Sequence, residues 1–501
     1  MSMVAHGYGL AAIGSPNLIF SNVLWGYLVR SIPEVGGVLG YSAATLGVLL
    51  FVGTSITYGL IRVGLGYLAT FSALVLIFIR PILFPQFTIN SGLLMVGAIV
   101  CWHLFARDKD QRALVIGCLL AFCSYLVRSQ EFLLVLFVAV PLLPWRILLT
   151  DRAPRIAVFV LSSAIVVSSL VDRQAYLGDD WSAFNELNPP RAAITDFGAG
   201  GALRSRPDIL ERHGYSLNDI SLIQAWFFVD PKIANPVKLK AMLEELGSLP
   251  SPGNAWGNAW AGVTTLWSPA LLPGTLAALL LAVLRPSRSV AVSWGLCIAA
   301  VSALGFMGRP GVLRVYVPLV SLLLIAPFIG CKSQVRCQTT LRRWLEISLL
   351  FLAAIASALP VFSESKASLS ISEQVRVELG SFPRHPVVVW GDSFPFEAAY
   401  PVLGTPPTVK DLQLYGLGVF TLSPFSVPYA EARAGRSMTI QLLFTNGVDI
   451  ISRSQIPLLE TYCIEHHQGT LLTSATMDRV PPLLVEVKNF RCQSATLLRK
   501  S

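Results

Sequence analysis

The sequence predicts an α-helical polytopic membrane protein, with about ten or eleven transmembrane helices, that ends in an extracytoplasmic α/β domain. The chain has 501 residues, of which 53% are hydrophobic and only 13% are charged. Apolar runs of roughly twenty residues, the length that a helix needs to cross a bilayer, recur through the first three quarters of the chain. After residue 361 they give way to short apolar runs between turn residues, a pattern typical of buried strands.

Ten apolar runs are predicted to span the membrane, since each is close to the length of about 20 residues that a bilayer requires. These runs are 41–60, 63–79, 91–106, 113–127, 132–149, 156–171, 268–284, 289–307, 312–330 and 344–361. Residues 17–30, NLIFSNVLWGYLVR, are shorter and amphipathic. This segment either spans as an eleventh helix or lies in the membrane interface.

The basic residues predict the orientation. Lys and Arg exceed Asp and Glu by 38 to 29, but they sit mainly in short loops between apolar runs, which indicates membrane topology and argues against nucleic-acid binding. Alternate loops carry Arg62; Arg107, Lys109 and Arg112; Arg146, Arg152 and Arg155; Arg285 and Arg288; and Lys332, Arg336, Arg342 and Arg343. The positive-inside rule places these loops in the cytoplasm and segments 172–267 and 362–501 outside it.

The predicted domains are a transmembrane domain over 1–361, which includes a folded outer loop at 172–267, and an α/β domain over 362–501. In the loop, SLNDISLIQAWFF (216–228) and NPVKLKAMLEELG (235–247) have helical spacing and capping residues. In the tail, the predicted strands are HPVVVWGD (385–392), GVDIISR (447–453), GTLLTSA (469–475) and PPLLVEV (481–487).

Two of the eight cysteines, Cys463 and Cys492, fall in the predicted outer tail. We expect them to form a disulfide, because outer compartments are oxidising. Cys331 and Cys337 lie at a predicted cytoplasmic edge and are expected to be structural thiols. Ser393, in VVVWGDSF, resembles the nucleophile of SGNH-type esterases, but the Asp-x-x-His that such enzymes need does not follow, which favours a turn after a strand.

Charged residues gather at the predicted outer interface. Arg128 and Glu131 lie at the tip of a hairpin in CSYLVRSQEFLLVLF. Asn185, Arg191 and Asp196 lie just beyond a membrane exit, in FNELNPPRAAITDFG. Arg309 lies in a tight outer loop, and Arg314 lies inside the next span, where an arginine costs on the order of 2 kcal/mol unless it snorkels or meets an anion.

The four arginines Arg128, Arg191, Arg309 and Arg314 share one predicted depth, which indicates an anionic ligand. Their planar guanidinium groups match phosphate oxygens, and the depth suggests a lipid-linked phosphate. Alternatively, they snorkel or pair with carboxylates such as Glu131. A carboxylate, Asp196 or Glu34, is the candidate general base. Asp179 and Asp180 fit a solvated loop best. The alternative is that they bind a divalent metal ion together with an incoming phosphate.

In layout the chain resembles bacterial polytopic membrane proteins of the GT-C glycosyltransferase type. FNELNPPRAAITDFG and GYSLNDISLIQAWFFVD look like segments of such proteins. The resemblance implies a protein of the bacterial plasma (inner) membrane that transfers a sugar from a polyprenyl-phosphate carrier to a cell-envelope glycan or lipid acceptor. Arg128, Arg309, Arg314 and Arg191 would then bind the lipid phosphate, and Glu131 and Asn185 would support them. The first outer loop, where the family carries its catalytic acid, offers Glu34 and no aspartate.

Two other functions fit parts of the pattern. A membrane O-acyltransferase with a fused outer domain would also combine many spans with a GDS block, but it needs an intramembrane histidine near its N-terminal motif, and only His6 precedes His103. A non-enzymatic component of surface-polysaccharide assembly or translocation would use the same architecture without catalysis. The tryptophans of GNAWGNAWAGVTTLW, Trp256, Trp260 and Trp267, fit an interfacial aromatic belt or a sugar-stacking platform.

Overall fold

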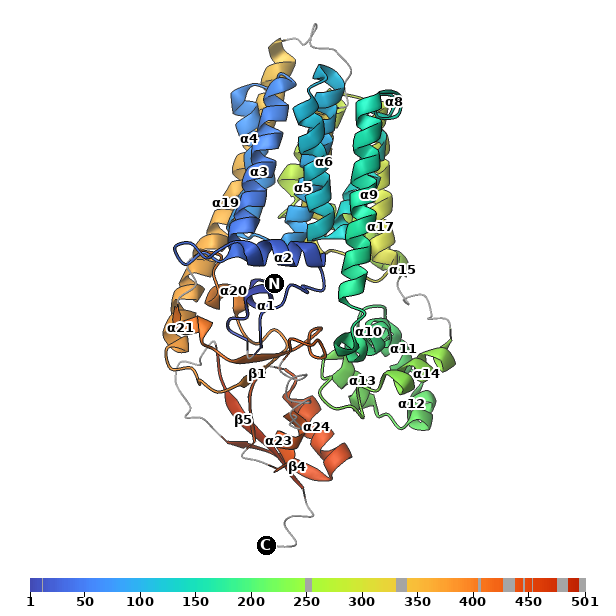
Figure 1. Ribbon diagram of the computed structural model, residues 1–501, viewed down its shortest axis with the longest axis vertical. Helices are drawn as coiled ribbons and strands as arrows, with labels where there is room; N and C mark the ends of the chain where they lie inside the picture. Colours follow the sequence, from blue (N-terminus) through green and yellow to red (C-terminus); the bar gives the residue numbers. More distant parts are fainter. Residues whose placement is uncertain are drawn as a thin grey trace.

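The computed structural model describes residues 1–10, 12–247, 255–329, 340–403, 407–426, 438–444, 447–452, 454–474 and 485–494. The chain is mostly helical and has three parts: a long helical bundle, a small helical unit and a sheet domain (Figure 1). The small helical unit and the sheet domain extend from the same end of the bundle, which we call the domain-facing end. The opposite end is called the far end.

Nine of the ten predicted spans each overlap one helix of the bundle over their described residues, and the tenth, 132–149, is divided among three helical segments. The helices are α3 (Gly40–Arg62), α4 (Tyr67–Leu83), α5 (Phe87–Asp108), α6 (Gln111–Val127), α7 (Ser129–Ala139), α8 (Trp145–Thr150), α9 (Arg152–Ala175), α16 (Leu272–Leu284), α17 (Arg288–Phe306), α18 (Leu313–Ile329) and the first half of α19 (Thr340–Leu379). Helix α5 is buried over 89% of its apolar window, against 11% for α9, so α5 is the centre of the bundle and α9 lies at its surface.

Five described helices, α3, α5, α9, α17 and α19, are long and apolar enough to cross a membrane. The number is six if α15 (Ala255–Thr264) with η3 (Thr265–Trp267) and α16 are counted as one bent span, with a bend of 84°. Four more helices, α4, α6, α7 (with its 3-10 extension) and α18, are apolar but shorter. Length and composition therefore indicate a membrane protein.

Three predicted boundaries differ from the structure. The run 132–149 is broken into α7, η1 (Val140–Leu142) and α8, because Pro141 and Pro144 cannot continue a regular helix. Within 17–30 the only helix is α2 (Val23–Ser31), whose nine residues are too short to span and which lies across the domain-facing end of the bundle (Figure 1). Helix α19 continues past 361 to Leu379, so the predicted domain boundary falls within one helix.

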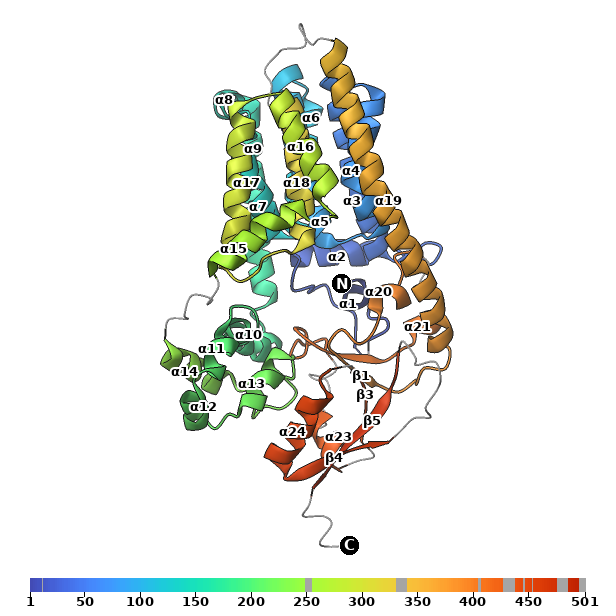
Figure 2. The same cartoon turned by 180° about the vertical axis from the view of Figure 1, so that it is seen from behind.

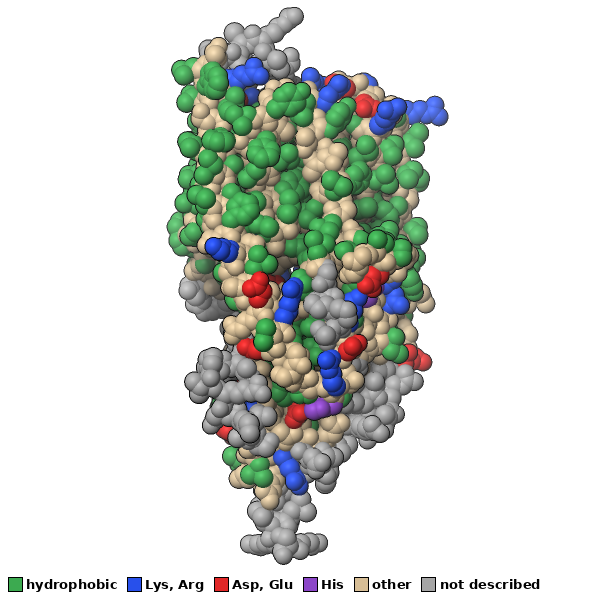
Figure 3. Space-filling model, turned by 90° about the vertical axis from the view of Figure 1, so that its left-hand side faces the viewer, with side chains coloured by type: hydrophobic (Ala, Val, Ile, Leu, Met, Phe, Trp, Pro, Cys, Tyr) green, Lys and Arg blue, Asp and Glu red, His purple; other side chains and the backbone are tan. Residues whose placement is uncertain are grey.

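On the face that Figure 3 shows, apolar side chains cover the length of the bundle, and charged side chains gather at its far end and again toward the domain-facing end. Ion pairs link neighbouring helices at that end. Arg62 lies 2.7 Å from Asp108, Lys109 lies 2.6 Å from Asp151, and Arg285 lies 2.8 Å from the buried Glu346. The described residues of the loops predicted to be cytoplasmic thus share one end, and the small helical unit and the sheet domain share the other.

The small helical unit confirms two helix predictions made from capping residues. It contains α10 (Ser182–Thr195), α11 (Ala199–Arg204), α12 (Pro207–His213), α13 (Leu217–Gln224) and α14 (Pro236–Leu246). Helix α13 begins with a capping box between Ser216 and Asp219. Helix α14 has Pro236 in its first turn and ends at Gly247, whose φ of 74° favours glycine.

The sheet domain contains β1 (Val387–Trp390), β2 (Leu414–Leu417), β3 (Val448–Ile451), β4 (Gly469–Ser474) and β5 (Lys488–Ser494), in the order β2-β1-β3-β5-β4. Strand β1 is parallel to β2 and β3, whereas β5 is antiparallel to β3 and β4. The described helices are α20 (Phe396–Ala399), α21 (Pro407–Lys410), α23 (Met438–Phe444) and α24 (Ile456–His467). Three predicted strands match β1, β3 and β4. The fourth, 481–487, lies mostly outside the described residues.

A disulfide joins Cys463 on α24 to Cys492 on β5, with a Cα–Cα distance of 5.7 Å. This is the pair that the sequence predicts, and it connects helix and sheet within one domain. Cys331 and Cys337 lie outside the described residues.

The N-terminal segment connects the bundle to the sheet domain. After α1 (Ser2–His6), Gly9 donates its N–H to the Lys410 carbonyl at 2.9 Å and accepts from the Leu414 N–H at 3.2 Å. Leu10 forms a parallel bridge with Leu414 on the edge strand β2. The first ten residues therefore extend the sheet by one bridge before the chain enters α2.

Candidate anion-binding site

The charged residues predicted from the sequence meet where the bundle faces the small helical unit. Arg128 is the single residue between α6 and α7, and its backbone is extended. The last carbonyls of α6, which have no partner within the helix, accept hydrogen bonds from the chain that precedes α2. Ser21 Oγ donates to Val127 at 2.8 Å, and the Asn22 N–H donates to Leu126 at 2.9 Å. These bonds hold the tip that carries Arg128.

Two buried serines fix the same tip against α5. Ser124 Oγ donates to the Ser91 carbonyl at 2.7 Å. Ser91 Oγ lies 2.9 Å from the Ser124 carbonyl and 3.0 Å from the Arg128 carbonyl. Small hydroxyl side chains allow helices to pack closely and bond across the contact. The backbone of Arg128 is therefore set by α5 as well as by the N-terminal chain.

The guanidinium group of Arg128 lies over two aromatic rings, at 5.8 Å from the centre of Phe20 and 5.2 Å from that of Phe87. Such contacts stabilise a cation without neutralising it. The charges of Arg309 and Arg314 lie close enough to act on Arg128. With the described residues, neither Arg128 nor Arg314 forms an ion pair, whereas Arg309 does. Arg128 is thus a cation without an ion-pair partner among the described residues, and two further arginines lie within electrostatic range of it.

Glu131 lies within electrostatic range of Arg128 and Arg314 and is buried, with 3% of its surface exposed. It lies beside Gly92 of α5, where an added Cβ would come within 3.3 Å of Glu131 Cγ and 2.3 Å of Pro318 in α18. Its Oε1 has no hydrogen-bond partner among the described residues, which is uncommon for a buried oxygen. Glu131 is therefore a buried carboxyl group that any polar partner at Oε1 would have to reach from outside the described residues.

Arg191 and Arg309 share one carboxylate. Arg191, buried on α10, donates to Asp196 Oδ2 at 3.0 Å and Thr195 Oγ1 at 3.3 Å, and also to Asn188. Arg309, in the loop after α17, lies 3.3 Å from the same oxygen of Asp196. Burial lowers the pKa of the Arg191 guanidinium, and Asp196 offsets part of this effect. Asp196 therefore bridges the bundle and the small helical unit.

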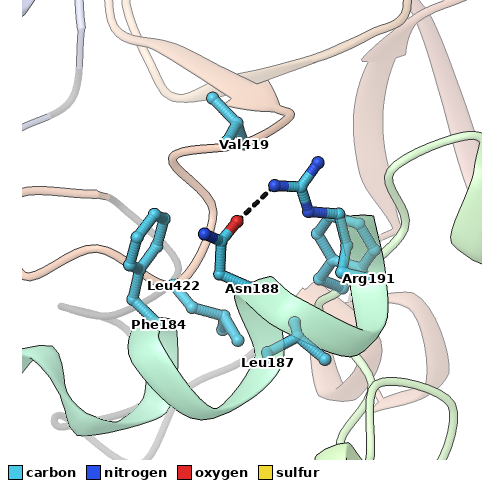
Figure 4. Close-up of a pocket in the computed structure, with 7 residues that line it drawn as sticks. Phe184, Leu187, Asn188, Arg191, Val419 and Leu422 are labelled. Atoms are coloured by element: carbon cyan, nitrogen blue, oxygen red, sulfur yellow. Dashed lines mark hydrogen bonds between the residues drawn. The ribbon is translucent and has the colours of Figure 1, made fainter. Parts of the chain in front are cut away.

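A small hollow lies beside Arg191, between α10 and the loop that follows β2 (Figure 4). Arg191 and Asn188 supply its polar groups, and apolar side chains supply the rest of its lining: Phe184, Leu187, Phe228, Val419 and Leu422. The ring of Trp226 lies 4.9 Å from the Arg191 guanidinium. The loop after β2 in the sheet domain thus packs beside Arg191, which positions Asp196.

Two predicted residues lie outside this cluster. Glu34 pairs with Lys410 Nζ at 2.8 Å, at the end of α21, on the opposite side of the molecule from α10 (Figures 1 and 2). Asn185 donates from Nδ2 to the Tyr176 carbonyl at 2.7 Å and so joins α10 to the end of α9. Of the two candidate bases, Asp196 adjoins the arginines and Glu34 does not.

The structure also places Ser393 and two of the tryptophans that the sequence analysis considered. Ser393 is buried in the turn after β1, and its Oγ donates to the Trp390 carbonyl at 2.9 Å. Trp256 and Trp260 lie on α15, which crosses the domain-facing end of the bundle (Figure 2), and they are 81% and 68% exposed. Such exposure is typical of aromatic rings at a membrane surface.

Sequence reasoning missed the residues that support the arginines. Phe20 and Phe87 are far from Arg128 in the chain, so no local spacing relates them. Ser91 and Ser124 do leave a signal, because each is a small hydroxyl residue within an apolar run.

No protein-family model, curated protein or solved structure matches this chain. The functional argument therefore rests on the geometry of the site.

Proposed function

We propose that the bundle is embedded in the plasma (inner) membrane of a bacterium, with the small helical unit and the sheet domain on the extracytoplasmic face. The apolar side of the bundle supports the embedding. The basic far end supports the orientation, because positively charged loops stay in the cytoplasm. The disulfide supports it as well, since disulfides persist in oxidising compartments.

We further propose that the protein is a glycosyltransferase. It transfers a sugar from a polyprenyl-phosphate-linked donor to a cell-envelope glycan or lipid acceptor. The observation that carries this proposal is the position of Arg128 at the domain-facing end of the bundle, close enough to Arg309 and Arg314 for both of their charges to act on it. Mutually repelling cations at this depth favour a bound anion, and guanidinium groups match phosphate oxygens. The polyprenyl chain would then lie along the apolar bundle.

In this reaction the donor's phosphate binds to Arg128 and Arg314. The bond between the sugar's anomeric carbon and the phosphate oxygen breaks as the acceptor oxygen bonds to that carbon. The guanidinium groups stabilise the negative charge that develops on the leaving phosphate. Glu131, buried beside Arg128 and Arg314 with no hydrogen-bond partner at Oε1 among the described residues, supports these arginines in the proposal.

The acceptor's hydroxyl proton passes to Asp196 in this proposal, since general-base catalysis needs a carboxylate close to the reacting oxygen. Arg191 and Arg309 orient that carboxylate from two sides. Glu34 has no part in the step, because its ion pair with Lys410 lies on the other side of the molecule.

The test is transfer of a labelled sugar from polyprenyl-phosphate donors by membranes that contain the protein. Membranes with Asp196→Asn protein at equal level are the comparison. We expect product with the natural chain and much less with the variant. No product from a folded protein with any donor would contradict the proposal and favour a non-enzymatic role in surface-polysaccharide assembly. Acyl transfer instead would favour the O-acyltransferase alternative.

A further inference from the structure

A second cluster of side chains lies away from the arginines, where α13 of the small helical unit meets α24 of the sheet domain. Asp219, Glu465 and His466 each offer one ligand atom, and these atoms lie within 4.8 Å of one another. His466 Nε2 is 2.7 Å from Asp219 Oδ1. Among the residues that the structure describes, no other group of three histidine, cysteine or acidic side chains converges in this way.

Neighbouring groups orient all three side chains. Asp219 is buried, and its Oδ2 accepts the Ser216 N–H at 2.9 Å, which directs Oδ1 toward His466. Ser216 Oγ donates to Glu465 Oε2 at 2.7 Å. The ring of Tyr462 lies 5.1 Å from that of His466. Side chains that bind metals are usually held by such outer contacts, which fix the direction of the ligand atom.

The charge of the cluster also favours a cation. Two carboxylates face one imidazole, and with the described residues neither carboxylate forms an ion pair with lysine or arginine. In two other histidine–carboxylate pairs, the carboxylate is bound by a further side chain from outside the pair. Glu245, beside His213, also binds Arg212 at 2.5 Å, and Asp449, beside His385, accepts from Asn489 at 2.7 Å.

We propose that Asp219, Glu465 and His466 bind a divalent transition-metal ion that joins the small helical unit to the sheet domain. One imidazole nitrogen and two carboxylate oxygens match Zn²⁺ best, with water as the fourth ligand of a tetrahedral site. The ion takes the place of the hydrogen bond between His466 and Asp219. It strengthens a contact that also includes Asn218, whose Nδ2 donates to the Leu458 carbonyl at 3.1 Å.

The proposal does not depend on the glycosyltransferase activity. The experiment uses the full chain, purified in detergent without a polyhistidine tag and freed of metal by a chelator. Zinc is added at low micromolar free concentration, bound zinc per chain is measured by mass spectrometry after equilibrium dialysis, and the unfolding temperature is recorded. We expect one tightly bound zinc ion and a higher unfolding temperature.

The decisive variant is Glu465→Gln. Glu465 is exposed, and the glutamine oxygen still accepts from Ser216, so the fold is retained while one charged ligand is lost. We expect this variant and His466→Gln to bind zinc at least about tenfold more weakly. His385→Gln is the matched control, because it removes a histidine paired with a carboxylate at 2.5 Å outside the cluster, and zinc binding should persist.

Three outcomes would overturn the metal site: no zinc bound by the natural chain, equal zinc affinity in folded Glu465→Gln protein, or an equal loss in the His385→Gln control. If His466→Gln protein fails to fold, Glu465→Gln alone decides.

Discussion

Arg309 reaches across from the bundle to Asp196 of the small helical unit, with Nη2 3.3 Å from Oδ2. Arg191 approaches the same oxygen at 3.0 Å from within that unit. One carboxylate oxygen thus forms ion pairs with two guanidinium groups from different parts of the chain. We infer that Asp196 fixes the position of the small helical unit relative to the bundle.

The first prediction concerns the stability of this contact. Asp196→Asn leaves the buried Arg191 without its anion, and breaking a buried ion pair is costly. Because Asp196 is 27% exposed, we expect a discounted loss on the order of 2 kcal/mol in the free energy of unfolding. Arg309→Ala should cost about 0–1 kcal/mol, since Arg309 is 47% exposed. Denaturation in detergent measures both, and equal losses would contradict the account.

The second prediction concerns the two serines below Arg128. Ser91→Ala removes the one hydroxyl donor that the Ser124 and Arg128 carbonyls share, so it should lower the free energy of unfolding by about 1 kcal/mol. Ser72→Ala is the matched control. Ser72 is equally buried, but its Oγ donates only within its own helix, to Leu68 at 2.9 Å, and its loss should cost less. Equal unfolding curves for the two variants would argue against an interhelical role for Ser91.

The third prediction concerns pH and the N-terminal segment. His6 Nε2 accepts the Tyr41 N–H at 3.1 Å, which requires a neutral imidazole. Burial lowers the pKa of His6 below 6.5, Arg30 and Lys410 lower this pKa further, and Glu34 opposes them. The unfolded chain therefore binds this proton more readily, and stability present above pH 6.5 is lost as the pH falls toward the folded pKa.

Limited proteolysis of the first ten residues checks this. Cleavage should be faster at about pH 5.5 than at about pH 7.5. His6→Gln should weaken this dependence, because the glutamine oxygen accepts from Tyr41 without titrating. A variant with the unchanged pH dependence would show that another group is responsible.

The fourth prediction concerns the disulfide. Cys463 and Cys492 are 29 residues apart, and closing a loop of that length stabilises a fold by about 3–4 kcal/mol in the chain-entropy account. Reductant should therefore lower the unfolding temperature of the sheet domain. A Cys463→Ser, Cys492→Ser double variant should unfold at the lower temperature with or without reductant. If reductant leaves the unfolding temperature of the natural chain unchanged, a structural role for the disulfide is contradicted.

The helices of the bundle were predictable because each contains a long apolar run, whether that helix lies at the centre of the bundle or at its surface. The breaks within these helices were less predictable. The run 132–149 is mostly apolar, and only Pro141 and Pro144 mark the place where the helix is interrupted. The end of α19 was also missed. Its sequence turns polar after 361, but a helix does not need apolar residues to continue, so composition gave a boundary that the backbone does not have.

Strands β1, β3 and β4 follow from their apolar or β-branched residues. Strand β5, KNFRCQS, is polar, and β2, LYGL, is short and contains glycine, so neither has a clear local signal. At the site, the topology predicted the depth of each charged residue but not its position around the bundle. The structure brings Asp196 and Arg309 together, whereas Glu34, at the same end, lies on the opposite side.

The central claim, that the arginines hold a lipid phosphate, is tested most directly by binding of labelled polyprenyl phosphate to the purified protein in detergent. Arg314→Ala is compared with Arg173→Ala, which removes an exposed arginine at the same end of the bundle but outside the cluster. Loss of a charge-assisted hydrogen bond should weaken binding at least about tenfold in Arg314→Ala protein and leave Arg173→Ala protein nearly unchanged. Equal affinity of folded Arg314→Ala and natural protein would contradict the account.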